Sequence, residues 1–83
     1  MENETKLNND GSVIFLNDCR KNNKTVKILF RYPDSTRSTK RTGKILLVSD
    51  THFILDEIYQ GQMCFSYQYI VEMEILKDGD YTR

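Results

Sequence analysis

The sequence predicts a mainly β fold, in which a short N-terminal α-helix precedes a five-stranded, strongly bent antiparallel β-barrel. Apolar residues show helical spacing only near the N-terminus, whereas after Thr25 they alternate with polar residues in short runs. Turn-forming residues separate these runs. A chain of 83 residues forms one small domain. We expect its strands to close as a barrel because an open five-stranded sheet would leave one face bare.

The predicted domain covers residues 12–76. Residues 1–11 are polar and end in Asn8-Asn9-Asp10-Gly11, so we expect a flexible tail there. Ser12 is the expected N-cap of a helix over residues 13–21, because Phe15, Leu16 and Cys19 give that segment one apolar face. Residues 77–83 are the expected C-terminal tail.

Five strands are expected after the helix, over residues 25–32, 43–49, 52–59, 63–69 and 71–75. The polar, basic stretch that leads to Thr42 is predicted to be a turn. Phe15 and Leu16 should pack the helix over one end of the barrel. The residues predicted to include most of the barrel interior are Val26, Ile28, Phe30, Ile45, Leu47, Ile54, Phe65, Val71 and Ile75.

The residue types present do not favour catalysis. The sequence has one histidine, no nucleophile–histidine–acid spacing and no glycine-rich phosphate loop. Asp56 and Glu57 are neighbours on a predicted strand, so their carboxylates should point to opposite faces. Cys19 and Cys64 lack metal-ligand spacing and are expected to be small apolar packing residues. We therefore expect no enzyme activity, no cofactor and no metal.

The N-terminus and the hydropathy of the chain bear on where the protein acts. The N-terminal residues are polar, unlike a signal peptide, and no run approaches the ~20 apolar residues of a membrane span. We therefore expect a cytoplasmic protein without a membrane partner.

The charge of the chain is unevenly distributed although the formal net charge is zero. Residues 20–44 contain nine Lys or Arg and a single acid, Asp34, which gives the segment a net charge of +8. Residues 1–19 carry −3 and residues 45–83 carry −5. Clustered positive charge attracts polyanions even on a neutral protein. The alternative is that these side chains only solubilise a helix end and a hairpin tip.

Several phrases resemble the bacterial Hfq-type RNA chaperones, a branch of the Sm-like proteins. Residues 15–28 fit the family phrase F-L-N-x-x-R-[RK]-x-x-x-x-V-x-I without a gap. Gly43, Asp50 and the apolar residues 53–55 look like the family's strand-two glycine, aspartate and following strand. Gln62-Met63, followed by aromatic residues and Ile70, is similar to its Q-M-V-Y-K-H-A-I stretch with one residue more. The resemblance covers residues 12–76 and implies a ring of six or seven subunits, with a hexamer expected, that binds single-stranded RNA in post-transcriptional regulation.

The sequence also departs from this family. The Lys-His pair that lines the family's pore is absent, and its positions hold Ser66 and Tyr67 or Tyr67 and Gln68. The stacking aromatic that follows the aspartate is matched by His52, and Arg20 and Lys21 match the rim cations. The turn between the first two strands is longer and more basic than in the family.

These observations predict RNA binding with low sequence specificity, based on phosphate contacts and some stacking. Alternatives remain for several residues: His52 as half-buried packing, Tyr67 as core or subunit interface, and the basic turn as a solvated tip. A second hypothesis is an Sm-like protein-interaction module that has lost its RNA sites. The predicted RNA-binding residues are Arg20, Lys21, Arg37, Lys40, Arg41, His52, Tyr67 and Gln68.

Overall fold

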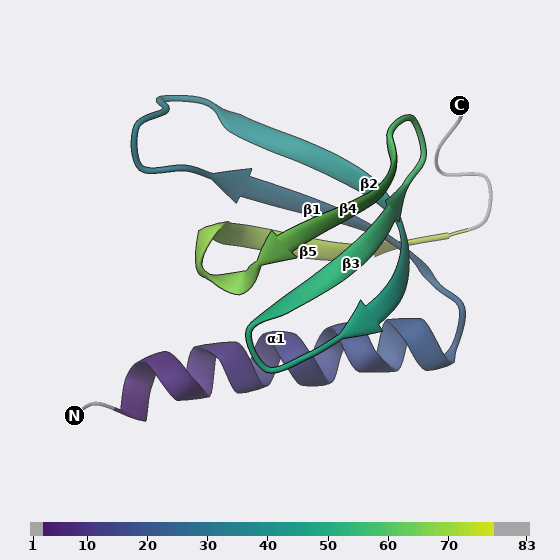
Figure 1. Ribbon diagram of the computed structural model, residues 1–83, viewed down its shortest axis with the longest axis horizontal. Coiled ribbons are helices and arrows are strands. Elements are labelled where there is room, and N and C mark those ends of the chain that lie inside the picture. The colour runs from purple at the N-terminus through teal and green to yellow at the C-terminus, as the bar shows by residue number, and fades with distance from the viewer. Residues whose placement is uncertain (1–2, 78–83) are drawn as a thin grey trace.

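One helix and five strands make up the computed structural model, which describes the backbone of residues 3–77 and the side chains of residues 11–77 (Figure 1). Residues 78–83 of the predicted C-terminal tail lie outside the described residues. A 3₁₀ turn, η1, separates the last two strands. The elements are α1 (Asn3–Lys21), β1 (Thr25–Arg31), β2 (Ser38–Val48), β3 (His52–Glu57), β4 (Gly61–Ser66), η1 (Tyr67–Tyr69) and β5 (Ile70–Leu76).

The five strands form one antiparallel sheet in the order β4-β3-β2-β1-β5. The sheet bends over on itself so that β3 and β4 cross in front of β1 and β5 (Figure 1). This arrangement confirms the mainly β class. The sheet is nevertheless unclosed, because β4 and β5 are its two edges and do not pair with each other. The predicted closed barrel is therefore not formed by the chain on its own.

The helix is longer than predicted. It begins at Asn3 instead of after an N-cap at Ser12, so residues 3–11, expected to be a flexible tail, are helical. A single glycine inside a helix costs only about 1 kcal/mol, and Gly11 therefore does not end it. At the other end, the N–H groups of Asn22, Asn23 and Lys24 donate to helix carbonyls at 3.0, 3.2 and 2.9 Å. Asn23 has a φ of 56°, the left-handed conformation that commonly ends a helix.

Strand β2 is also longer than predicted, and it starts at Ser38 instead of Gly43. The basic stretch expected to be a turn is therefore largely paired with β1, and only residues 32–37 connect the two strands. The aromatic residues at 67 and 69, expected on the fourth strand, instead form η1. Gly43 is required where β2 passes β3, because a Cβ at this position would collide with the main-chain carbonyl of Asp56.

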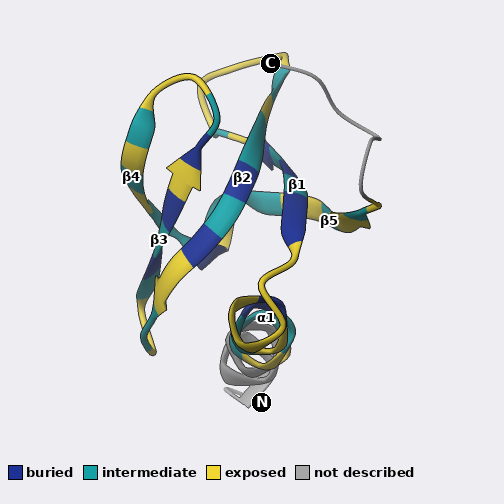
Figure 2. Cartoon of the chain, turned by 90° about the vertical axis from the view of Figure 1, so that its right-hand side faces the viewer, coloured by how far each residue is buried: buried dark blue, intermediate teal, exposed yellow. Residues whose placement is uncertain are grey.

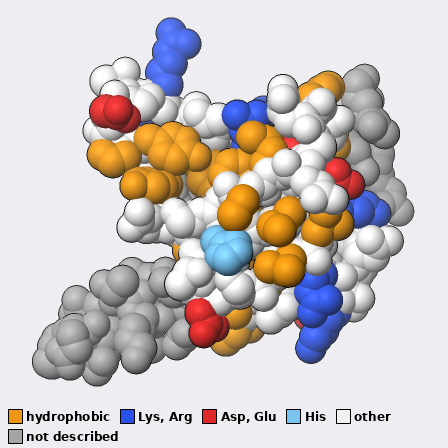
Figure 3. Space-filling view, in the orientation of Figure 1, with side chains coloured by type: hydrophobic (Ala, Val, Ile, Leu, Met, Phe, Trp, Pro, Cys, Tyr) orange, Lys and Arg blue, Asp and Glu red, His pale blue; other side chains and the backbone are white. Residues whose placement is uncertain are grey.

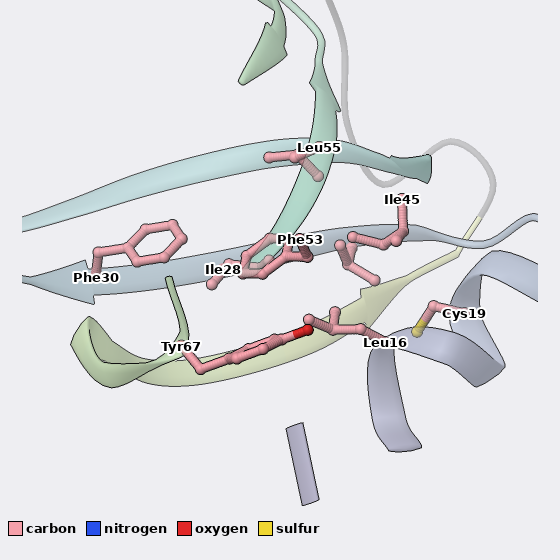
Figure 4. Close-up of a cluster of buried hydrophobic side chains, with 9 residues drawn as sticks. Leu16, Cys19, Ile28, Phe30, Ile45, Phe53, Leu55 and Tyr67 are labelled. Atoms are coloured by element: carbon pink, nitrogen blue, oxygen red, sulfur yellow. The ribbon is translucent and has the colours of Figure 1, made fainter. Parts of the chain in front are cut away.

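The core lies inside the bent sheet, and α1 packs against it at one end (Figures 2 and 4). Among residues 11–77, nine hydrophobic residues are buried: Leu16, Cys19, Val26, Ile28, Phe30, Ile45, Phe53, Leu55 and Tyr67. Leu16, Val26, Ile28, Phe30 and Ile45 were predicted to be core residues, and the structure confirms them. Phe15, Ile54 and Phe65 are only partly buried. The prediction is wrong for Leu47, Val71 and Ile75, which are 44%, 54% and 41% exposed.

Two β-bulges explain the errors at Leu47 and Val71, whereas Ile75 lies opposite the buried Val26 and is exposed on the edge strand β5. In the β2–β3 ladder the register shifts between Ile45 and Leu47, so Leu46 has no partner. The residues of β2 that face inward therefore have odd numbers before Leu46 and even numbers after it. Strand β3 alternates without interruption, and its inward residues are Phe53 and Leu55, so the prediction of Ile54 as a core residue chose the wrong face of this strand. A second shift between β1 and β5 leaves Val71 without a partner. A strictly alternating pattern cannot follow a strand across such an inserted residue.

The two cysteines have different environments. Cys19 is buried in the core as predicted, and burial, followed by the nearby Asp18 carboxylate, raises the pKa of its thiol. Cys64 is exposed on edge strand β4, so its predicted role as a packing residue is wrong.

Candidate functional site

The β1–β2 hairpin carries exposed cations on an arm that extends beyond the rest of the sheet (Figure 1). Strand β3 pairs with β2 only from Gly43 onward, so the preceding part of β2 is bordered by β1 alone. Arg37 is exposed in the connecting turn, where its N–H donates to the Ser35 hydroxyl at 3.2 Å. Lys40 is exposed opposite Leu29. Both predicted phosphate ligands are thus accessible.

Arg31 joins these two cations although the sequence prediction omitted it. It is exposed and pairs with Ser38, whose hydroxyl accepts a hydrogen bond from Arg31 Nη2 at 3.4 Å. Arg31 and Lys40 therefore project from the same face of the hairpin. The strand alternation in the sequence already indicated that Arg31 is exposed, because it points this side chain away from the face on which the core residue Phe30 lies. We call Arg31, Arg37 and Lys40 the arm cations.

Arg41 is separated from the arm cations by the pleat of β2. Its partner on β1 is Ile28, which is fully buried, so Arg41 faces the inner side of the sheet. The residue is half-buried, and its Nε atom is enclosed without a hydrogen-bond partner among the described residues. The expectation that Arg41 acts together with Arg37 and Lys40 is therefore not met by the geometry of the chain.

Arg20 and Lys21 are exposed in the last turn of α1. The guanidinium of Arg20 donates from Nε and Nη2 to Asn17 Oδ1 at 3.3 and 3.2 Å, which orients it along the helix surface. The helix end and the tip of the β1–β2 hairpin lie at opposite corners of the molecule (Figure 1). The basic segment is therefore divided into two separate regions within one chain.

His52 is the first residue of β3, next to the β2–β3 turn, and is held by hydroxyl groups. Its Nδ1 is 3.1 Å from both the Ser49 and the Thr51 hydroxyl oxygens. The Ser49 hydroxyl also donates to the His52 carbonyl at 3.0 Å and accepts from the His52 N–H at 3.2 Å. The imidazole is half-buried, and hydrophobic side chains lie beside it on the face shown in Figure 3. His52 thus retains a partly accessible ring in a fixed orientation.

Tyr67 is a core residue and does not offer a free stacking surface. It is 5% exposed, and its ring centroid lies 5.4 Å from that of Phe53 in a stacked arrangement. Its hydroxyl donates to the main-chain carbonyl of Ser49 at 2.5 Å and is 3.0 Å from that of His52. Burial raises the pKa of this phenol, and the hydrogen bond to Ser49 opposes the shift. Of the two readings, the core position agrees with the structure.

Tyr67 also brings η1 against the β2–β3 turn. Because its hydroxyl contacts the backbone on both sides of that turn, the exposed Gln68 lies at the same end of the molecule as His52. Arg41 and Tyr67 face the interior, and the other predicted site residues form three groups: His52 with Gln68, Arg37 with Lys40 among the arm cations, and the helix-end pair Arg20 and Lys21.

Two acidic residues of the sheet, Glu57 and Glu74, make identifiable contacts. Lys27 on β1 forms an ion pair with Glu74 on β5, with 3.1 Å between Nζ and Oε1. Asp56 is exposed and Glu57 is buried, as expected for neighbours on a strand. Glu57 Oε1 accepts the N–H groups of Tyr59 and Gln60 at 3.0 and 2.7 Å, which fixes the β3–β4 turn. In the described part of the chain, no three His, Cys, Asp or Glu side chains converge on a possible metal site.

None of the helical residues that the structure describes forms a segment long and apolar enough to cross a membrane. No family model, no curated protein and no solved structure matches this chain.

Proposed function

We propose that this chain is an Sm-like RNA-binding protein that assembles into a ring. The observation that carries the proposal is the unclosed sheet, in which an N-terminal helix precedes five bent strands and β4 and β5 are left as edges. This element order and topology are compatible with the Sm-like fold suggested by the residues 15–28.

Strand pairing between copies would complete the barrel that one chain leaves open. Edge strands present unpaired N–H and C=O groups, and an exposed edge is a liability unless it is covered. The edges also carry apolar side chains, since Val71 and Ile75 on β5 are about half exposed and Cys64 on β4 is exposed. Pairing β4 of one copy with β5 of the next is a head-to-tail contact, which closes into a ring when the rotation permits.

RNA binding would depend on the arm cations and on the helix-end pair Arg20 and Lys21. These side chains are exposed, and Arg and Lys are the usual ligands of the phosphate backbone. In a ring, the separate regions of neighbouring copies are repeated around the rim, so a single strand can contact several of them. His52 supplies a partly accessible flat ring for a base. Contacts of this kind carry little sequence information.

Two measurements test the proposal. Light scattering combined with size-exclusion chromatography should give a mass of several 9.8 kDa chains. Fluorescence polarisation should detect binding of oligo-U, oligo-A and a scrambled RNA with similar affinities that fall steeply with salt. A monomer at tens of micromolar would remove the ring, and the absence of binding to all three RNAs at low salt would remove the RNA function.

A protein-interaction module is the second candidate, and a row of apolar side chains favours it. Leu47 on β2, Ile54 on β3 and Cys64 on β4 are successive cross-strand neighbours on the outer face. Leu46 and Leu47 are each 44% exposed. Apolar side chains grouped on a surface are typical of contact sites. A ring that binds none of the three RNAs would favour this candidate.

A further inference from the structure

Six aromatic side chains form a continuous row that leads from the core toward the surface. Consecutive rings in this row have centroids between 4.6 and 6.2 Å apart. The two ends differ in burial, because Tyr67 and Phe53 lie in the core (Figure 4), whereas Tyr32 and Tyr69 are half-buried. In order, the row consists of Tyr67, Phe53, Phe65, Phe30, Tyr32 and Tyr69.

Tyr69 is the last ring of this row and has a single ring neighbour within the described part of the chain. Its centroid lies 5.0 Å from that of Tyr32, and the two ring planes are inclined at 51°. Aromatic rings favour tilted or offset contacts of this kind over a face-to-face sandwich. No other ring among the described residues lies against Tyr69. At least one face of the Tyr69 ring is therefore not covered by another ring.

The two tyrosines of η1 differ in how their hydroxyl groups are held. The Tyr67 hydroxyl donates to the main-chain carbonyl of Ser49. The Tyr69 hydroxyl has no hydrogen-bond partner among the described residues, and it is not enclosed. A buried tyrosine usually finds such a partner, so the Tyr69 hydroxyl points toward solvent. Tyr67 is thus fixed by hydrogen bonds, whereas the ring of Tyr69 reaches the surface.

The segments next to Tyr69 carry mixed charge. Asp34 and Arg37 are both exposed in the β1–β2 connection, which begins with the ring neighbour of Tyr69. Gln68 precedes Tyr69 in η1 and is exposed and neutral, and Glu72 is exposed on β5. A ligand at this place would therefore be recognised by contact with the ring and not by a concentration of charge.

We propose that Tyr69 is a base-stacking residue for single-stranded RNA, an inference that rests on the RNA-binding function proposed above. A nucleobase on the uncovered face of Tyr69 would continue the row of rings. Every base has a π-face, so such stacking tolerates any sequence. Tyr67 attaches η1 to the β2–β3 turn, and Tyr69 attaches it to the end of β1. A base at Tyr69 would thus lie between His52 and the hairpin that carries the arm cations.

Three variants measured by fluorescence polarisation test the inference with oligo-U, oligo-A and a scrambled RNA. Tyr69→Leu keeps an apolar side chain but removes the π-face, so it should weaken binding of all three RNAs about fivefold or more. The salt dependence should stay as in the wild type, because stacking neutralises no phosphate. Tyr69→Phe keeps the ring and should retain the affinity. Tyr59→Leu is the matched control, because Tyr59 is 68% exposed at the other end of β4 from η1.

Photochemical cross-linking of the wild type gives a second measurement that does not depend on any variant folding. Ultraviolet irradiation of the protein with an oligo-U strand that carries 5-bromouridine should give a cross-link that mass spectrometry localises to Tyr69. Light scattering shows whether Tyr69→Leu keeps the mass of the wild type. If that mass changes, the cross-link decides: attachment at Tyr69 supports the inference, and attachment only at other residues overturns it.

The outcomes separate this inference from the function on which it rests. Unchanged affinity in Tyr69→Leu overturns the inference and leaves RNA binding in place. An equal loss in Tyr69→Phe or in Tyr59→Leu also overturns it, because neither result depends on the ring of Tyr69. Binding of none of the three RNAs by the wild type removes the proposed function and this inference together.

Discussion

The salt dependence of RNA affinity gives a quantitative test of the arm cations. We consider the triple variant Arg31→Gln, Arg37→Gln and Lys40→Gln, which removes three exposed positive charges from one arm of the molecule. On single strands each phosphate neutralised contributes about −0.7 to the slope of log affinity against log salt. If each side chain neutralises one phosphate, the slope should become shallower by about 2.

This change of slope is large enough to measure by fluorescence polarisation. Between about 50 and 200 mM salt, a slope difference of about 2 corresponds to a roughly 15- to 20-fold change in the ratio of wild-type to variant affinity. The effect should be the same for oligo-U, oligo-A and a scrambled sequence, since phosphate contacts do not read bases. Lys27→Gln is the control. The ammonium of Lys27 is already paired with Glu74, so this substitution should change the slope little.

Two results would refute the reasoning. An unchanged slope in the triple variant would show that the arm cations do not contact RNA. A strong uridine preference that persists at high salt would show that base contacts elsewhere dominate, for example at Gln68 in η1.

Three further predictions concern stability and reactivity. Phe53→Ala removes a fully buried ring, so it should lower the free energy of unfolding, measured in urea, by about 3–5 kcal/mol. Leu47→Ala changes a side chain that is 44% exposed and should lower the same free energy by less than about 1 kcal/mol. Similar losses in the two variants would contradict the assigned strand faces. Tyr67→Phe removes a buried hydrogen bond and should cost about 0.5–1.5 kcal/mol near neutral pH. The pKa of Tyr67 in the folded protein lies above the ordinary value of 10.0, so its stabilising contribution is complete below pH 10 and is lost as the pH rises through the folded pKa. Urea titrations above pH 10 should therefore show a smaller loss of stability in Tyr67→Phe than in the wild type. Parallel plots of stability against pH for the two proteins would contradict this. Thiol reagents should modify Cys64 in the native protein and Cys19 only on unfolding, because Cys19 is buried and the pKa of its thiol is raised. Equal rates of modification of the two cysteines, followed by mass spectrometry, would contradict the assigned burial.

The sequence predicted the type and order of the elements more successfully than their faces. The alternation of Val26, Ile28 and Phe30 predicted β1 and its buried side correctly, because that face follows the pattern of an uninterrupted strand. The same reasoning failed after Leu46 and at Val71, because each bulge inserts one residue that only the pairing of strands distant in sequence determines. The helix start was missed because polar residues and Gly11 carry no apolar stripe.

The candidate site shows the same limit. Counting charges predicted that residues 20–44 are basic, and the exposure of Arg37 and Lys40 agrees with a role at the surface. Counting could not show that strand pairing sends Arg41 to the inner face, or that α1 and the hairpin tip lie at opposite corners.

The hydrogen bonds of Tyr67 determine how freely the neighbouring turn can change in sequence. The phenol contacts the main-chain carbonyl oxygens at positions 49 and 52, and every residue type supplies such an oxygen. The attachment of η1 to the β2–β3 turn therefore does not depend on the imidazole of His52. A different side chain at position 52 would alter the chemistry offered to a ligand without removing these hydrogen bonds, whereas loss of the Tyr67 hydroxyl would remove them whatever residue occupies position 52. The fold thereby separates the residue that anchors this surface from the residue that can diversify its recognition.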